Sequence, residues 1–122
     1  MKRILYVEDT RDNRELVCQM LDDLYQIETA IDGEEGLRKA QESPPDLMLI
    51  DISLPVMDGL TLTRRIRADA HLNQIPIVAL TAHCMVGDRE KALAAGCDDF
   101  LSKPFRMMQL RDMVADRLAA VE

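Results

Sequence analysis

Residues 47–59 read LMLIDISLPVMDG, and this stretch is the most informative one for the fold. Four consecutive apolar residues, 47–50, predict a strand that is covered on both faces, because a strand with one wet face would alternate polar and apolar residues. The run stops at Asp51, and the residues from Pro55 to Gly59 are typical of a turn. A strand buried on both faces is typical of a parallel sheet between two layers of helices.

Short apolar runs alternate with helical stretches on both sides of this segment. We expect strands over 4–7, 26–30, 47–50, 75–80 and 100–102, and helices over 12–24, 33–42, 60–70, 88–95 and 106–121. Strict alternation of this kind implies parallel strands with right-handed crossovers, hence an α/β fold. In the first helix, Asp12 and Glu15 match a capping box. Its expected apolar face consists of Leu16, Val17, Met20, Leu21 and Leu24.

Length and composition indicate one globular domain, 1–122, with an aliphatic core, since the chain holds two Tyr, two Phe and no Trp. A net charge of −7 argues against direct binding of nucleic acid or of an anionic membrane surface. No apolar stretch approaches the length of a transmembrane helix, and we expect a cytoplasmic protein. Three cysteines without a C-x-x-C pair predict free thiols rather than disulfides or a zinc site.

Polar residues follow four of the five expected strands. They are Glu8, Asp9, Asp51, Thr81 and Lys103. Each residue alone is typical of a helix cap or a solvated side chain. However, the carboxyl ends of parallel strands meet at one edge of the sheet, so five such positions favour a shared site.

The residue types in this set predict metal-assisted phosphoryl transfer to an aspartate. Two carboxylates about 4 Å apart repel by about 4 kcal/mol at an effective dielectric constant of about 20, so a cation is expected between them. Oxygen ligands suit Mg²⁺. A carboxylate can act as the nucleophile, while a lysine and a hydroxyl contact the phosphoryl oxygens.

Four segments carry a resemblance to a known family. Residues 4–9, 49–59, 79–82 and 100–105 read ILYVED, LIDISLPVMDG, ALTA and FLSKPF. In this order and spacing they resemble the response-regulator receiver domain over essentially the whole chain. The resemblance implies a flavodoxin-like, doubly wound (βα)5 fold with strand order 2-1-3-4-5. It also implies a two-component or phosphorelay signalling domain that takes its phosphoryl group from a histidine kinase or a phosphotransfer protein. Such a domain is not an enzyme beyond its own phosphorylation and slow autodephosphorylation.

The resemblance assigns the chemistry to particular residues. Asp51 matches the phosphoacceptor, and Lys103 matches the lysine that pairs with a phosphoryl oxygen. Glu8, Asp9, Asp51 and the backbone carbonyl of Ser53 match the ligands of Mg²⁺ or Mn²⁺. The Ser53 side chain also lies at one of two positions that tune the lifetime of the aspartyl phosphate in this family.

Further matches concern the switch. Thr81 matches the hydroxyl that moves toward the phosphoryl group, and Ala82 the small residue that leaves access to it. Phe100 stands at the aromatic switch position, where the family more often has Tyr, and we expect it to sample the inward state before phosphorylation. Pro104 matches the proline after a cis peptide bond, and His83 is the second position for tuning the phosphoryl lifetime.

Output is expected through a protein partner that binds the surface from about Asp88 to Val121, as in the family. Asp98 and Asp99 match the dimerisation pattern of related transcription regulators, but Met113 stands where those proteins commonly carry a basic residue. We therefore expect a monomer, with a dimer as the alternative. We also expect a stand-alone regulator, because the chain starts at Met and no output domain follows residue 122.

Two other functions compete with this interpretation. A small phosphatase of the haloacid-dehalogenase type also uses an Asp nucleophile, but residues 51–53 read DIS and lack the second Asp of that pattern. A pseudo-receiver would act only through protein contacts and would be expected to lack a site residue, whereas all of them are present. Both alternatives are weaker than phosphorylation at Asp51.

Overall fold

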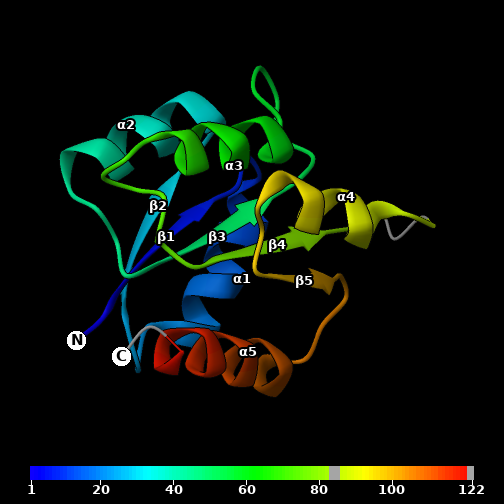
Figure 1. Cartoon of the computed structure of the whole chain (residues 1–122). Helices are drawn as coiled ribbons and strands as arrows, with labels where there is room; N and C mark the ends of the chain where they lie inside the picture. Colours follow the sequence, from blue (N-terminus) through cyan, green and yellow to red (C-terminus); the bar gives the residue numbers. More distant parts are fainter. Residues whose placement is uncertain (83–85, 121–122) are drawn as a thin grey trace.

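The computed structural model describes residues 1–82 and 86–120, and within them five parallel strands form one sheet (Figure 1). The strands are β1 (Arg3–Val7), β2 (Gln26–Ala30), β3 (Leu47–Asp51), β4 (Ile77–Thr81) and β5 (Asp99–Ser102). Their order, β2-β1-β3-β4-β5, confirms the expected flavodoxin-like arrangement.

Helices cover both faces of the sheet (Figure 1). They are α1 (Arg11–Leu21), α2 (Gly33–Glu42), α3 (Gly59–Ala68), α4 (Asp88–Ala95) and α5 (Met107–Ala119). Helices α1 and α5 lie on one face, and α2, α3 and α4 lie on the other. In the described residues no helix combines the length and the apolar character needed to cross a bilayer.

The central strands are buried on both faces, as the apolar runs predict. All five residues of β3 and all five of β4 are buried. Neighbouring side chains alternate between two core clusters, because successive residues of a strand point to opposite faces. In β1, Tyr6 packs on the α1–α5 side, whereas Leu5 and Val7 pack on the α2–α4 side.

Helix α1 begins earlier than the sequence suggests, and the capping box is wrong. The N-cap residue is Thr10, whose side chain makes no capping hydrogen bond, so Asp12 already lies inside the helix. The Glu15 carboxylate instead accepts a hydrogen bond from Arg11 Nε at 3.0 Å, one helical turn away.

The end of α1 also differs from the expectation. The backbone N–H groups of Leu24 and Tyr25 both donate to the carbonyl of Leu21 at 3.0 Å, which turns the chain toward the edge strand β2. Leu24 therefore leaves the helix and is 44% exposed, and Leu16 is 51% exposed. Of the expected apolar face, only Val17 and Leu21 are fully in the core.

Strand β4 is shifted relative to the expected range of 75–80. Pro76 has no N–H group for a ladder, but its carbonyl accepts a hydrogen bond from Met48 N at 2.9 Å, and the strand starts at Ile77. Its last residue is Thr81, just as Asp51 is the last residue of β3.

Of the cysteines in the described part of the chain, Cys18 and Cys97 are free thiols, in line with the prediction.

Candidate functional site

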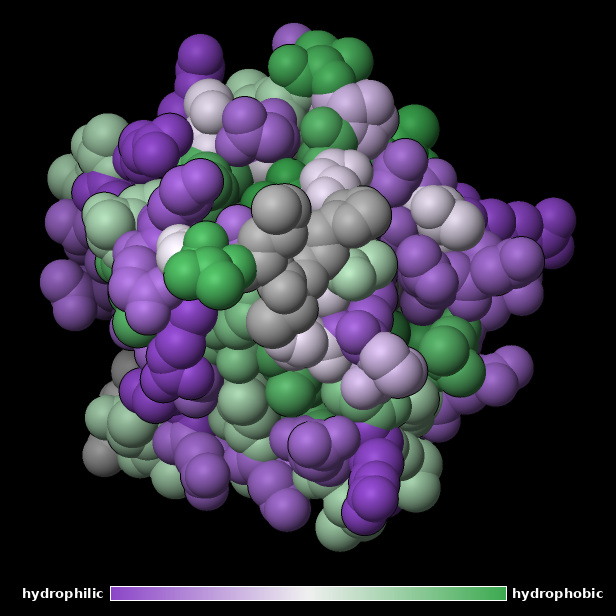
Figure 2. All heavy atoms as spheres, turned by 90° about the vertical axis from the view of Figure 1, so that its right-hand side faces the viewer, coloured by the Kyte–Doolittle hydropathy of each residue, from purple (hydrophilic) through white to green (hydrophobic). Residues whose placement is uncertain are grey.

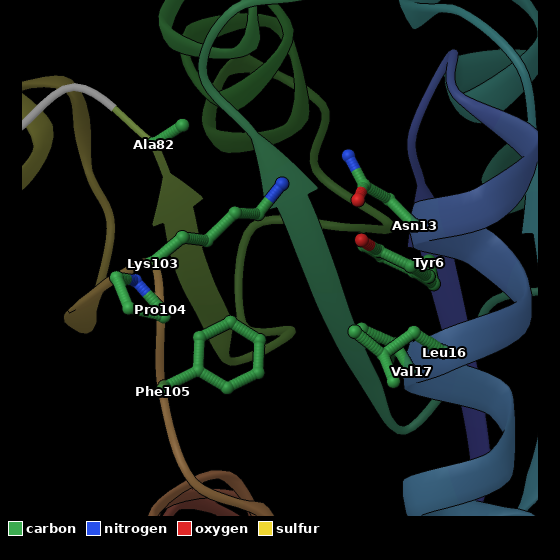
Figure 3. Close-up of a pocket in the computed structure, with 8 residues that line it drawn as sticks. All are labelled: Tyr6, Asn13, Leu16, Val17, Ala82, Lys103, Pro104 and Phe105. Carbon is green, nitrogen blue, oxygen red and sulfur yellow. The ribbon is translucent and has the colours of Figure 1, made fainter.

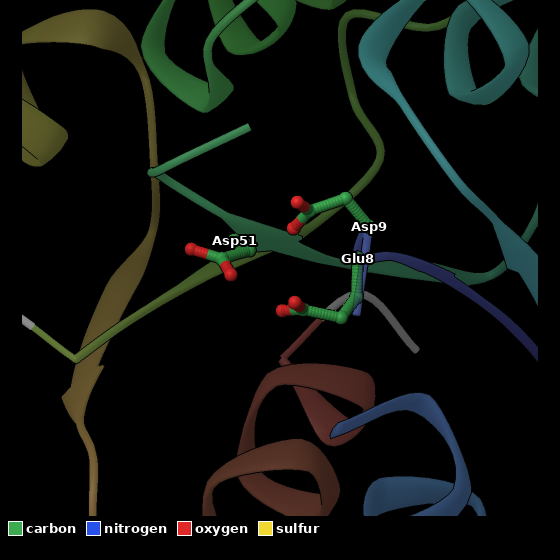
Figure 4. Close-up of side chains that lie close together, drawn as sticks. All are labelled: Glu8, Asp9 and Asp51. Carbon is green, nitrogen blue, oxygen red and sulfur yellow. The ribbon is translucent and has the colours of Figure 1, made fainter. Parts of the chain in front are cut away.

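Three carboxylates meet at the carboxyl ends of β1 and β3. Val7 pairs with Ile50 in the parallel register, so Glu8 and Asp9 follow β1 directly beside Asp51. Each of these three acidic residues offers a ligand oxygen, and the oxygens all lie within 4.8 Å of one another. Figure 4 shows the three side chains directed toward a common space. Glu8 and Asp51 are buried, whereas Asp9 is exposed.

Lys103 supplies the positive charge nearest to this cluster. Its Nζ atom lies 3.3 Å from Glu8 Oε2 and 3.5 Å from Asp51 Oδ2. The side chain starts at the end of β5 and crosses toward β1 (Figure 3). Within the part of the chain that the structure describes, one ammonium group therefore faces three carboxyl groups.

Glu8 is completely buried, and its carboxylate is held by four groups. Besides Lys103, it accepts hydrogen bonds from Thr10 N at 3.1 Å, Asn13 Nδ2 at 3.3 Å and the Tyr6 hydroxyl at 3.4 Å. These donors fix the orientation of Glu8 before any ligand binds.

Asp51 is 6% exposed and has fewer partners than Glu8. Its Oδ1 atom accepts a hydrogen bond from Ser53 N at 2.9 Å, and Lys103 approaches Oδ2. Burial raises the pKa of Asp51 to about 6, and the hydrogen bond and the negative charge of Glu8 add to this effect. Burial also acts to raise the pKa of Glu8, but the hydrogen bond with Asp51, the charge of Lys103 and the donors at Thr10 and Asn13 outweigh it and lower that pKa to about 2. Of the two carboxyl groups, Asp51 therefore has the higher pKa and takes up a proton first as the pH falls.

Thr81 and Lys103 reach the site through the register of β4 and β5. Thr81 pairs with Ser102, and the backbone N–H of Lys103 donates to the Thr81 carbonyl at 2.7 Å. Thr81 is buried at the end of β4. The peptide bond between Lys103 and Pro104 is cis.

A groove of about 400 Å³ opens beside Lys103 between α1 and the segment that joins β5 to α5 (Figure 3). Ala82 lies at one end of it (Figure 3). The residues lining the groove are Tyr6, Asn13, Leu16, Val17, Ala82, Lys103, Pro104 and Phe105. Figure 2 shows the face that carries the site, on which hydrophobic side chains lie in separate patches among hydrophilic ones.

The remaining predicted site residues are spread around this centre. Phe100 lies inward: its side chain is 8% exposed and belongs to the core on the α2–α4 side. Ser53 is exposed in the loop after β3. His83 and Val121 lie outside the described residues.

Several partners of Glu8 were not predicted from the sequence. Tyr6 and Asn13 both contact its carboxylate, and Arg14 Nη1 donates to the Glu8 backbone carbonyl at 2.9 Å. A tyrosine two residues before an acidic strand end places both side chains on the same side of the strand, and that spacing could have revealed the first contact. The contacts from α1 depend on how the helix packs.

The donor set fits a hard divalent cation. All three side chains offer carboxylate oxygens, which are the ligands that Mg²⁺ prefers, and Mg²⁺ commonly takes one or two carboxylates and keeps several waters. Neutralising the charge of the cluster is the physical reason for a cation at this place.

Comparison with known proteins supports the interpretation of the site as that of a receiver domain. The family model "Response regulator receiver domain" matches residues 4–115. Hybrid signal transduction histidine kinase G of Dictyostelium discoideum is 46% identical over 116 residues, which cover 92% of this chain and 3% of that protein. Signal transduction histidine-protein kinase BarA of Escherichia coli is 36% identical over 91% of this chain and 12% of that protein. The chain thus spans a small part of the length of these curated relatives.

A solved structure of similar size has the same fold. It is the receiver domain of the sensor histidine kinase PA1611 from Pseudomonas aeruginosa, described with a magnesium ion coordinated in its active site cleft. That domain is 39% identical to this chain with a TM-score of 0.90, and the match covers 97% of this chain and 98% of the other. Sheet order, acidic edge and family match agree: this chain belongs to the response regulator receiver domain family of two-component signalling.

Proposed function

We propose that Asp51 accepts a phosphoryl group from a histidine kinase or a phosphotransfer protein, with a divalent cation bound at the acidic cluster. One observation carries the proposal: oxygens of Glu8, Asp9 and Asp51 lie within 4.8 Å of one another at the carboxyl ends of β1 and β3, opposite Lys103. The residues that would hold Mg²⁺ are these three acids and the backbone carbonyl of Ser53.

The transfer can be written for the groups of this chain. An Asp51 carboxylate oxygen forms the bond to phosphorus, while the bond from phosphorus to the donor imidazole nitrogen breaks and its electron pair stays on the imidazole. Bound Mg²⁺ would neutralise the carboxylates and the phosphoryl oxygens. Lys103, now 3.5 Å from Asp51, is within reach of a phosphoryl oxygen placed there, and Ala82 leaves the approach open.

We propose that Thr81 and Phe100 transmit the modification to α4, β5 and α5. Thr81 ends the strand next to Asp51, and Phe100 pairs with Ala79 of that same strand. In this structure the Phe100 side chain is already in the inward position. A phosphoryl group would therefore shift the equilibrium between the two switch states through its differential interaction with Thr81.

A monomer that binds another protein is the oligomeric state we propose. Asp98 and Asp99, the two residues that match a dimerisation pattern, are engaged within the chain. Asp98 pairs with Arg67 at 2.9 Å, and Asp99 pairs with Arg117 at 3.2 Å. A dimer that used these carboxylates would have to compete with both ion pairs.

The family match does not favour the phosphatase alternative.

Phosphorylation with a small donor tests the proposal. Incubated with acetyl phosphate and Mg²⁺, the protein should gain one acid-stable, base-labile phosphoryl group, detected by intact-mass spectrometry. Asp51→Asn should abolish the mass shift, whereas Asp58→Asn, an exposed acid seven residues further on that caps α3, should retain it. Labelling of Asp51→Asn to the wild-type level would overturn the assignment.

A further inference from the structure

The loop that follows Asp51 carries Ser53 and is closed at its base. Gly59 N donates to the Ile52 carbonyl at 3.0 Å, so residues 52–59 form a closed turn of chain. Ser53 N contacts Asp51 Oδ1 at 2.9 Å. Any displacement of this loop therefore displaces Ser53 relative to the phosphoacceptor.

The tip of the loop is conformationally strained. Met57 N donates to the Pro55 carbonyl at 2.7 Å, and the residue between them, Val56, has φ +67°. This is the rare γ-turn with positive φ, and a β-branched residue in that region is a genuine outlier. The Val56 side chain is 86% exposed, so its own contacts do not hold the strained turn in place. The neighbouring residues must do so.

Two apolar side chains anchor the loop to the core on the α2–α4 side. Leu54 is 7% exposed and belongs to that core cluster, and Met57 packs against the same cluster, as does Ile52 at the base of the loop. Ser53, Pro55 and Val56 remain exposed between and beside these anchors. Ile52 is also held by the sheet, through its N–H bond to the Leu80 carbonyl at 3.0 Å, so on its far side the position of Ser53 depends on Leu54 and Met57.

Met57 packs directly against Gly33, the first residue of α2. A Cβ atom at Gly33 would lie 2.8 Å from the Met57 carbonyl oxygen and 2.9 Å from Met57 Cβ, distances that real Cβ atoms essentially never show. Gly33 does not have a positive φ, so glycine is required here for space and not for its backbone freedom. The nearest atoms include the backbone of Met57, which cannot move aside by a change of rotamer.

We propose that Gly33 and Met57 are positioning residues for the cation site. The contact between them holds the strained loop against the N-terminus of α2 and thereby fixes the position of the Ser53 carbonyl. The inference rests on the proposed function, because it takes Ser53 as a ligand. Under this proposal α2 contributes no ligand itself but influences the affinity for Mg²⁺ through the position of the loop.

The test compares two identical substitutions in α2. Gly33→Ala pushes the Met57 backbone, whereas Gly36→Ala is equally crowded but meets a Val7 methyl group at 2.8 Å and leaves the loop alone. The Mg²⁺ dissociation constant is measured by NMR titration of the Ile52 and Ser53 amides, and the unfolding midpoint is measured in parallel. We expect Gly33→Ala to raise the dissociation constant about tenfold, as loss of a supporting residue around metal ligands commonly does, and Gly36→Ala to change it less than about twofold.

A second variant keeps the test decisive if Gly33→Ala does not fold. Met57→Ala removes the anchor without crowding, and it should also weaken Mg²⁺ binding. Wild-type affinity in the folded Gly33→Ala protein, or in Met57→Ala, overturns the positioning role. Equal weakening by Gly36→Ala overturns it as well, since contact with the loop would then have no special effect compared with crowding against Val7. Failure of the wild-type protein itself to bind Mg²⁺ would instead reject the proposed function, and the positioning role with it.

Discussion

Lys103 is the residue on which the charge of the site depends. Its ammonium group is the one cation that contacts both Glu8 and Asp51 among the described residues. The side chain of Glu8 is 1% exposed, so its charge has little water to stabilise it. Removing one partner from a buried ion pair is much more harmful than removing one from an exposed pair.

Lys103→Met should therefore destabilise the metal-free protein by roughly 2 kcal/mol, below the 3–5 kcal/mol typical of buried pairs because Glu8 keeps its hydrogen bonds. Mg²⁺ should restore most of the loss, since it replaces the missing positive charge and no longer faces the repulsion of Lys103. Urea unfolding with and without Mg²⁺ measures both effects.

Arg11→Met provides the control at the same scale. It breaks the Arg11–Glu15 pair, whose side chains are 81% and 56% exposed, and should cost about 0.5 kcal/mol or less, independent of Mg²⁺. If Lys103→Met were as mild as this control, Lys103 would not balance the acidic cluster.

At the scale of elements, the β3–α3 loop is the segment in which local conformational preference and tertiary structure disagree. Val56 adopts φ +67° although β-branched residues avoid it. Among residues other than glycine, Asn is several-fold enriched at positive φ. The strain is thus a property of this residue type at this position, and it can be relieved without altering a ligand.

Val56→Asn should stabilise the protein by about 1 kcal/mol, because Asn adopts a positive φ at lower energy than a β-branched residue does. Val86→Asn is the control at a second exposed valine, where the change should stay within about 0.5 kcal/mol. Chemical denaturation of both variants gives the comparison. A loss of stability in Val56→Asn would show that the turn is not strained in solution.

At the scale of the whole molecule, the acidic cluster couples cation binding to folding. The three carboxylates come from β1 and β3, so their mutual repulsion opposes the docking of the two central strands and is lost in the unfolded chain. A ligand that binds only the folded state stabilises it by mass action.

Mg²⁺ at about 100 times its dissociation constant should raise the free energy of unfolding by about 2.7 kcal/mol. Asp9→Ala should remove most of this gain, whereas Asp112→Ala, which removes an exposed acid of α5, should leave it intact. Melting curves recorded over a Mg²⁺ series measure the shift. An unchanged curve at millimolar Mg²⁺ would count against the site.

The sequence by itself determined the sheet, its strands and the residues at their ends. Runs such as 47–50 reveal burial directly, because a strand covered on both faces cannot alternate. Once the strands are parallel, chain direction alone brings Glu8, Asp51, Thr81 and Lys103 to one edge. The register of the structure places them there.

Only the tertiary structure decided which groups touch and which carboxyl group of the acidic pair has the higher pKa. Burial raises the pKa of Asp51, whereas contacts with Asp51, Lys103, Thr10 and Asn13 lower the pKa of Glu8, and these partners come from different parts of the chain. The exposure of Leu16 and the contact between Gly33 and Met57 likewise depend on how α1 and α2 pack. These properties are set by distances between segments remote in the chain, and local patterns of residue type do not encode such distances.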